Sequence, residues 1–527
     1  MLQLLRPLLP AAKIIFALFL GYFALRLLSY HFALVTFPFP EGLREGAMMT
    51  STDALVRGIN PYAMSLQPQL MNQYGIIYPL FVWPWAKFFG TTMLVHRIVT
   101  ASFILASCVL IYFVLRKLNV PLLLNVWAIL MLYSSLIYPA TSTPTIDPGA
   151  TGLFFFLLTI FVPWFYNYSY KSLLISIACG ILAFYTKAYF LLGIFIMASF
   201  LFIFTSKIKG LFYVLLLLIL AGISMVVVNQ TLPAYFDNCF FTSINMAHAW
   251  SSMQRLHEQV VKYGELHQWT FFLIGAIFLW HGFKTIHNYS WDNIKKNIKI
   301  IFWSLRLKGL KEPLFKLDFP LVLYVGTCSS FVLYLSLGRH TGAMLWYFFQ
   351  LLSPFVLIAA VWLFSRQAFW PILCVPFLIY NLYTMSADQN DKWFNKNMPG
   401  WPEVALVISQ HQRILNSPLI APLLIEQHKP IVDDGQAEYF GSGGQRIYWM
   451  KSIFKEDGRV MVQLMMYFQN IRAMVEKKAY DLIILQPSLL PLGVADEIQK
   501  YYKYEGQLIL YAPGDRRPYA LTFWKPL

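Results

Sequence analysis

Acidic and basic side chains flank the apolar runs of this sequence at positions where charge is costly. Glu41 and Glu45 follow the first apolar run, in "FPFPEGLREG", and their spacing would place both carboxylates on one side of a helix. Asp147 directly precedes a later apolar run, and Lys187 lies between two more. Carboxylates and cations gathered in one place suit a reaction in which a hydroxyl or amine is deprotonated while a phosphate leaves.

Further basic candidates lie at the ends of other apolar runs. Arg339 and His340 occupy a tight turn between two runs, and His96 and Arg97 begin another. Arg can hold a phosphate through two parallel hydrogen bonds, and Lys acts as a point charge. These cations would neutralise the charge that develops on a departing phosphate.

Each candidate also has an interpretation that involves no chemistry. The two glutamates can be solvated acids at a helix end, Asp147 can cap the helix that Pro148 begins, and Lys187 can extend its amine to the membrane interface. His96 and Arg97 can be an interfacial basic pair.

The composition indicates a membrane protein. Of its 527 residues, 58% are hydrophobic and only 13% are charged. About 20 apolar residues suffice for one transmembrane helix. This criterion predicts eleven spans, near residues 14–36, 92–115, 119–138, 150–166, 171–186, 188–205, 210–228, 269–283, 319–337, 343–364 and 367–385.

The basic residues orient these spans. Lys and Arg exceed Asp and Glu by 41 to 25, and most of the excess lies in short segments at alternate turns, above all in 284–316. This is the distribution expected of cytoplasmic segments, so we interpret the charge as an orientation signal and not as a nucleic-acid surface. The loop 37–91, the loop 139–149, the turn 338–341 and the segment 386–527 are then predicted to lie outside. The basic turn at Arg339 runs against this bias, which favours a functional role for it.

Two regions outside the spans have patterns of their own. In the first outer loop, "LREGAMMTSTDALVRG" and "YGIIYPLFVWPWAKFFG" are expected to be helices lying along the membrane interface. After residue 386, "KPIVDD", "YDLIIL" and "QLILYAP" are typical of strands, whereas "GRVMVQLMMYFQNIRAMVEKK" and "VADEIQKYY" are typical of helices. We therefore predict a polytopic α-helical membrane domain, 1–386, and a small C-terminal α/β domain, 387–527, that covers the site or binds the acceptor.

The order of these motifs resembles the GT-C superfamily of membrane glycosyltransferases, in the bacterial branch similar to protein O-mannosyltransferases and lipid A aminoarabinose transferases. The resemblance rests on "PEGLREG", "LVRGINPY", "YGIIYPL" followed by "FFG", "TIDPGATGLFFFLL", "LAFYTKAYFLLG" and "GRHTGAMLWYFFQLLSPF", in that order. It implies inverting transfer of a hexose or pentose from a polyprenyl-phosphate-linked donor to a lipid, glycan or protein acceptor. The implied location is the periplasmic face of a bacterial cytoplasmic (inner) membrane.

The resemblance also implies roles for the matching residues. Glu41 takes the position of the first-loop acid, a general base, and Asp147 that of the second outer-loop acid. The family often has adjacent acids where Gly42 follows Glu41, so Glu45 stays a rival base; Ile146 stands where the family often has Arg. The donor phosphate would be held by Lys187, Arg339, His340 and Arg97. Substrate contacts are expected from Tyr62, Tyr74, Tyr78, Tyr347 and Gln350.

The same residues bear on whether the reaction needs a metal ion and on which other functions the sequence could support. Three carboxylates could ligate Mg²⁺ or Mn²⁺, but the neighbouring cations favour a metal-independent reaction with no metal site. A transporter or flippase of lipid-linked sugars would line its pathway with intramembrane charges, and a surface-polysaccharide polymerase or ligase is a further alternative. Charges at helix ends on one side, with no evident internal repeat, favour the transferase. The sugar, the acceptor and the oligomeric state stay open.

Overall fold

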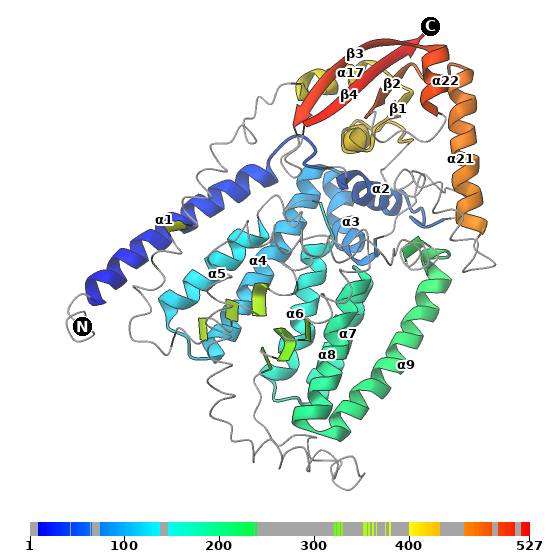
Figure 1. Cartoon of the computed structure of the whole chain (residues 1–527). Coiled ribbons are helices and arrows are strands. Elements are labelled where there is room, and N and C mark those ends of the chain that lie inside the picture. The colour runs from blue at the N-terminus through cyan, green and yellow to red at the C-terminus, as the bar shows by residue number, and fades with distance from the viewer. Residues whose placement is uncertain are drawn as a thin grey trace, which may run out of the picture.

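The structure is a computed structural model of the chain. It describes residues 9–42, 44–63, 65, 74–137, 146–236, 238–239, single positions between 321 and 380, and 400–432, 458–486, 494–511 and 518–527. Within these residues, a group of long apolar helices lies below two short helices of the first outer loop, and a sheet with its own helices lies above them (Figure 1).

The long helices form where the sequence has its first seven apolar runs. Four are long and apolar enough to cross a membrane: α1 (Leu9–Val35), α4 (Met93–Lys117), α9 (Lys207–Thr231) and the composite Ala188–Thr205, made of η4 (Ala188–Leu191), α8 (Leu192–Phe200) and η5 (Leu201–Thr205). Three are apolar but shorter: α5 (Leu122–Leu136), α6 (Gly149–Phe165) and α7 (Tyr170–Phe184).

The predicted total of eleven spans is tested only in part. The predicted span 269–283 lies outside the described residues, and those at 319–337, 343–364 and 367–385 are described at single positions only. These four spans stay predictions.

The two helices of the first outer loop have different surroundings. Helix α3 (Ile77–Phe89) buries Tyr78, Val82 and Ala86 at four-residue intervals and exposes Trp85 and Phe88 on the other side, which suits a helix at a membrane interface. Helix α2 (Glu45–Val56) buries nine of its twelve residues against other parts of the protein. Its place along the membrane interface stays a prediction.

Helix α2 can be buried because its polar side chains are satisfied locally. The hydroxyls of Thr50, Ser51 and Thr52 each donate to the carbonyl four residues earlier. Its methionines Met48 and Met49 pack in one apolar cluster with residues from the C-terminal part of the chain. The sequence of α2 alone does not indicate that the C-terminal part packs on this helix.

The C-terminal part contains a four-stranded sheet in the order β1-β2-β4-β3. Its strands are β1 (Ile414–Asn416), β2 (Leu482–Leu485), β3 (Tyr502–Tyr511) and β4 (Pro518–Pro526); β1 and β2 are parallel, and the other pairs are antiparallel. Its helical elements are α17 (Trp401–Gln410), η8 (Pro418–Ile420), α18 (Ala421–Glu426), α21 (Gly458–Glu476) and α22 (Val494–Tyr501). The strands in "YDLIIL" and "QLILYAP" and both helices form where predicted.

The strand predicted in "KPIVDD" is wrong for its described residues, 429–432, which lie outside any strand. Lys429 instead donates its amine to carbonyls at the end of α17, among them Ser409 at 3.1 Å and His411 at 2.5 Å. Val432 bonds through its N–H to the side chain of Asn416 at 2.9 Å. Residues 429–432 are thus held by contacts with side chains and helix carbonyls and not by backbone hydrogen bonds to a neighbouring strand.

Candidate active site

Five of the predicted site residues meet at one end of the helices. Glu41 and Glu45 follow α1, Arg97 lies one turn into α4, Asp147 precedes α6, and Lys187 lies between α7 and η4. All five side chains are buried. Segments far apart in the sequence therefore build one polar cluster, at the end of the helices that the charge pattern predicts to be outside.

The sequence-based expectation for the two glutamates needs a correction. They do not lie on one helix, because α2 begins at Glu45 and Glu41 lies in the bend before it. The chain turns at Gly42, and Glu45 reaches back so that its Oε2 accepts the backbone N–H of Glu41 at 2.8 Å. The two carboxylates still meet, through this turn instead of through helical spacing.

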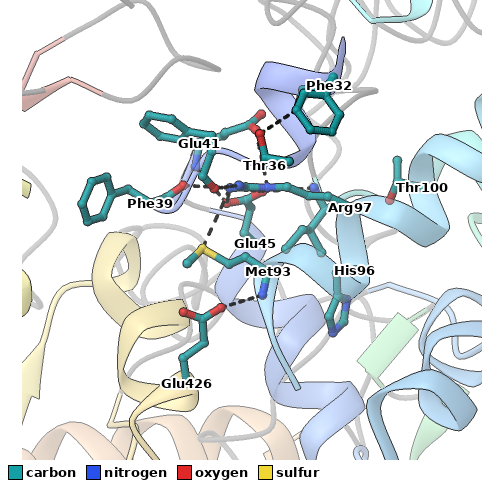
Figure 2. Close-up of polar contacts among 12 residues, drawn as sticks. Phe32, Thr36, Phe39, Glu41, Glu45, Met93, His96, Arg97, Thr100 and Glu426 are labelled. Carbon is teal, nitrogen blue, oxygen red and sulfur yellow. Dashed lines mark hydrogen bonds and ion pairs between the residues drawn. The ribbon is translucent and has the colours of Figure 1, made fainter. Parts of the chain in front are cut away.

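Both carboxylate oxygens of Glu45 accept hydrogen bonds from other parts of the site. Nη2 of Arg97 lies 3.0 Å from its Oε2, and the backbone N–H of Ile146 donates to its Oε1 at 3.2 Å. Arg97 also donates to the carbonyl of Phe37, and to that of Phe39 at 2.8 Å. Glu45 is thus the acid that holds Arg97, the Glu41 turn and the Ile146 segment together. Figure 2 shows it beside Arg97 and Glu41.

Glu41 differs from Glu45 although it lies beside it. Neither of its carboxylate oxygens accepts a hydrogen bond from the described residues, and Nε of Arg97 is 3.4 Å from its Oε1. Burial raises the pKa of this carboxyl well above the usual range of Glu, Arg97 opposes that rise, and Glu45 adds to it. A pKa moved toward neutrality with free lone pairs suits a general base.

Asp147 and Lys187 form the second half of the cluster. The amine of Lys187 lies 2.7 Å from Oδ1 and 3.0 Å from Oδ2 of Asp147. Oδ1 also accepts the N–H of Gly149 at 2.6 Å. The N-cap of α6 is Pro148, and Asp147 lies one residue before it, so the interpretation of Asp147 as the N-cap is wrong. Burial lowers the pKa of Lys187 and Asp147 raises it.

The position of Lys187 depends on a break between two helices. Its backbone is extended, with φ −150° and ψ 130°, between the end of α7 and the start of η4. The N–H groups of Gly75 and Ile77 donate to the carbonyls of Thr186 and Tyr185 at 3.2 and 3.3 Å. A Cβ on Gly75 would lie 1.8 Å from the Tyr185 oxygen, so this close approach of the first loop to the break requires glycine.

The predicted tyrosines bond to the protein itself. The hydroxyl of Tyr62 donates to the carbonyl of Tyr74 at 2.8 Å, and that of Tyr78 lies 3.1 Å from Thr100 Oγ1. The Tyr74 ring faces the Lys187 amine, 5.2 Å from its centroid. Tyr74 therefore lies against Lys187, Tyr78 lies near both ion pairs, and Tyr62 supports the backbone of Tyr74. Arg339, His340, Tyr347 and Gln350 lie outside the described residues, so their roles stay predictions.

Two residues of this cluster were missed by the sequence analysis. Arg44 lies close enough to Lys187 to lower the pKa of that amine, and its only signal was its place between the two glutamates. Glu426, at the end of α18, accepts the backbone N–H of Met93 at 2.7 Å. Burial raises the pKa of Glu426, while Met93 and Arg97 oppose that rise. No pattern near Glu426 indicates this contact.

The metal prediction is not tested by the structure. Among the residues that the structure describes, no group of three His, Cys, Asp or Glu side chains could hold a metal ion. Metal independence stays a prediction.

Comparisons with known proteins return solved structures only. No family model matches the chain, and no curated protein does. Two structures of ArnT from Cupriavidus metallidurans, one bound to undecaprenyl phosphate and one in the apo state, are similar to it at 12% identity. Their TM-scores are 0.45 and 0.44, over 87% and 89% of this chain and 80% of each ArnT chain. At such identities and scores the match assigns no family, activity, ligand or site to this chain.

Proposed function

We propose that this chain is a membrane glycosyltransferase that moves a sugar from a polyprenyl-phosphate-linked donor to an acceptor hydroxyl or amine on the outer face, with inversion and without a metal ion. One observation carries the proposal. Glu41 is a buried carboxylate without a hydrogen bond from the described residues, and it lies at the same end of the helices as two buried ion pairs, Arg97–Glu45 and Lys187–Asp147.

Glu41 is the base in this proposal, and Glu45 is not. The acceptor oxygen or nitrogen attacks the anomeric carbon, Glu41 takes the acceptor's proton, and the bond from that carbon to the phosphate oxygen breaks. Glu45 cannot take a proton without releasing Arg97 and the N–H of Ile146. Its part in this proposal is to hold Arg97 in place, which favours Glu41 as the base.

In this proposal, Lys187 neutralises the negative charge of the leaving phosphate. An ammonium has three donors, and those of Lys187 face both oxygens of Asp147. A phosphate that approaches would share the amine with Asp147, and Arg44 adds positive charge nearby. Asp147 therefore acts as the group that positions Lys187, and Arg97 acts on Glu41 instead of on the phosphate. Arg339 and His340 stay further candidate contacts for the phosphate.

Transfer of a radiolabelled sugar from a polyprenyl-phosphate donor, measured in membranes, tests the proposal. Glu41→Gln and Lys187→Ala should abolish most of the transfer, whereas Asp53→Asn should not. Asp53 is the matched control because it lies on α2 but pairs with Arg57 at the surface. Undiminished transfer in both site variants would rule out this site.

The same preparation separates the transferase from a flippase. A flippase moves the lipid-linked sugar across the bilayer without breaking the bond to phosphate, so no free polyprenyl phosphate forms. A transferase releases one polyprenyl phosphate for each sugar transferred. Chromatography of the lipid fraction distinguishes the two products.

A further inference from the structure

The C-terminal part of the chain contacts the proposed site at two separate places. Glu426, at the end of α18, accepts the N–H of Met93 in the first turn of α4. Trp401, at the start of α17, stacks on the ring of Phe39, with centroids 5.4 Å apart and planes 11° from parallel. These contacts come from different helices, and they flank the same side chain, Arg97.

Both contacts act on residues that hold the Arg97 guanidinium. Phe39 offers its carbonyl to Nη2 of Arg97 at 2.8 Å, while its ring is held by Trp401. Met93 places its sulfur 3.9 Å from the same nitrogen, while its N–H is held by Glu426. Figure 2 shows Glu426, Met93 and Arg97 in this sequence of contacts, with Glu41 on the far side of the guanidinium and Phe39 to its left.

We propose that Glu426 is a positioning residue of the active site: it fixes Met93 and the first turn of α4, and so holds Arg97 against Glu41 and Glu45. The C-terminal part then completes the site and does more than cover it. This inference rests on the proposed function only for its kinetic consequence, because the contact itself is independent of the substrate.

The chemistry of this contact explains why an acid is used. The first N–H groups of a helix have no partner within it, and a carboxylate there satisfies one of them and interacts favourably with the helix dipole. Glu426 also faces the positive Arg97 and the negative Glu45, so it shares in the charge balance of the guanidinium. Apolar packing of η8 and α18 with α2 brings the carboxylate to this place.

The test compares three variants of the full-length chain in nanodiscs. Glu426→Ala removes both the acceptor and the charge, Glu426→Gln keeps an acceptor oxygen for Met93 and removes the charge, and Glu403→Gln removes an exposed acid from the same part of the chain. Hydrogen exchange is followed at residues 93–97 and in the C-terminal sheet, which reports whether that part still folds. Transfer is measured as kcat, as KM and across pH.

We expect Glu426→Ala to speed exchange at residues 93–97, to lower kcat about tenfold, within the ~100-fold loss that a 1 Å misplacement can cause, and to leave KM nearly unchanged. Glu426→Gln should restore protection and most of kcat. Its pH profile should still differ from the wild type: without the charge of Glu426, Arg97 acts more fully on Glu41, whose pKa falls, and the acidic limb moves to lower pH. Glu403→Gln should match the wild type throughout.

The outcomes separate this inference from the proposed function. Wild-type kcat in Glu426→Ala overturns the positioning role and leaves the glycosyltransferase standing. Faster exchange in Glu426→Ala together with no transfer by any form supports the contact and refutes the function. Slow exchange at residues 93–97 in Glu426→Ala, with the sheet intact, overturns the inference whatever the activity.

Discussion

The two halves of the site use acids in different ways. In the Arg97 half, one guanidinium faces two carboxylates, of which Glu45 is saturated and Glu41 accepts no hydrogen bond from the described residues. In the Lys187 half, one ammonium faces one carboxylate, which also serves the start of α6. The Arg97 half therefore contains a carboxylate, Glu41, whose oxygens can still accept a proton, whereas the carboxylate of the Lys187 half is already bonded. This difference is the reason why we propose proton removal in the Arg97 half and phosphate binding in the Lys187 half.

The largest expected effect comes from Glu41→Gln, which removes the base and leaves the hydrogen bonds intact. Transfer should fall by about 10²- to 10⁴-fold, the usual contribution of a general base. The melting temperature should change little, because Arg97 loses its contact with Glu41 but keeps its bonds to Glu45 and to the carbonyls of Phe37 and Phe39. Single-turnover transfer and thermal unfolding in detergent measure the two quantities. A large loss of stability would mean that Glu41, like Glu45, is a structural acid.

Breaking the Lys187 half should affect stability as well as activity. Asp147→Asn leaves a buried ammonium without its counter-charge, which costs about 3–5 kcal/mol when one partner of a buried pair is removed. Asp147 and Lys187 are both nearly inaccessible to solvent, so little screening offsets this loss. Thermal unfolding and the yield of folded protein measure it. If Asp147→Asn unfolds at the wild-type temperature, the ion pair does not hold the two segments together.

Gly75→Ala tests the backbone contact that places Lys187. The added methyl would lie 1.8 Å from the Tyr185 carbonyl oxygen, so the first loop must move away from the helix break. Overpacking of this kind typically costs about 1–3 kcal/mol. Gly42→Ala is the matched control, since a Cβ there meets nothing within 4 Å and the residue lies in the same loop. Equal melting temperatures for the two variants would contradict the close approach.

The smallest effect should be a shift of one limb in the pH profile of kcat/KM. Activity should rise as Glu41 loses its proton, at a pH above the usual range of Glu, and fall as Lys187 loses its proton, at a pH below the usual range of Lys. Arg44 lowers the pKa of Lys187, so Arg44→Gln should raise that pKa and move the alkaline limb to higher pH. The acidic limb should stay in place. A shift of the acidic limb alone would mean that Arg44 acts on Glu41 instead.

Many site residues could be predicted from the sequence, because charged residues at the ends of apolar runs are rare and often functional. Apolar runs place the first seven helices, and acids or bases at their ends mark Glu41, Glu45, Asp147 and Lys187. These predictions need only the length of a span and the cost of burying charge.

Other features depend on contacts between distant segments. Which glutamate is free is set by Arg97 and by the N–H of Ile146, and neither is near the glutamates in sequence. The burial of α2 is set by the C-terminal part, and its composition alone is as compatible with an interfacial helix. Glu426 lies in an apolar segment with no pattern of its own. Tertiary packing determines these three features, and local sequence patterns do not predict tertiary packing.

The bond between Met93 and Glu426 joins residues 333 positions apart, and this separation bears on how the protein is made. A chain is synthesised from its N-terminus at about 5–20 residues per second, so α4 waits on the order of tens of seconds for α18. During that time the first turn of α4 and the buried face of α2 lack their final neighbours. The site is therefore complete only after α18 has been synthesised and has packed against α2 and the start of α4.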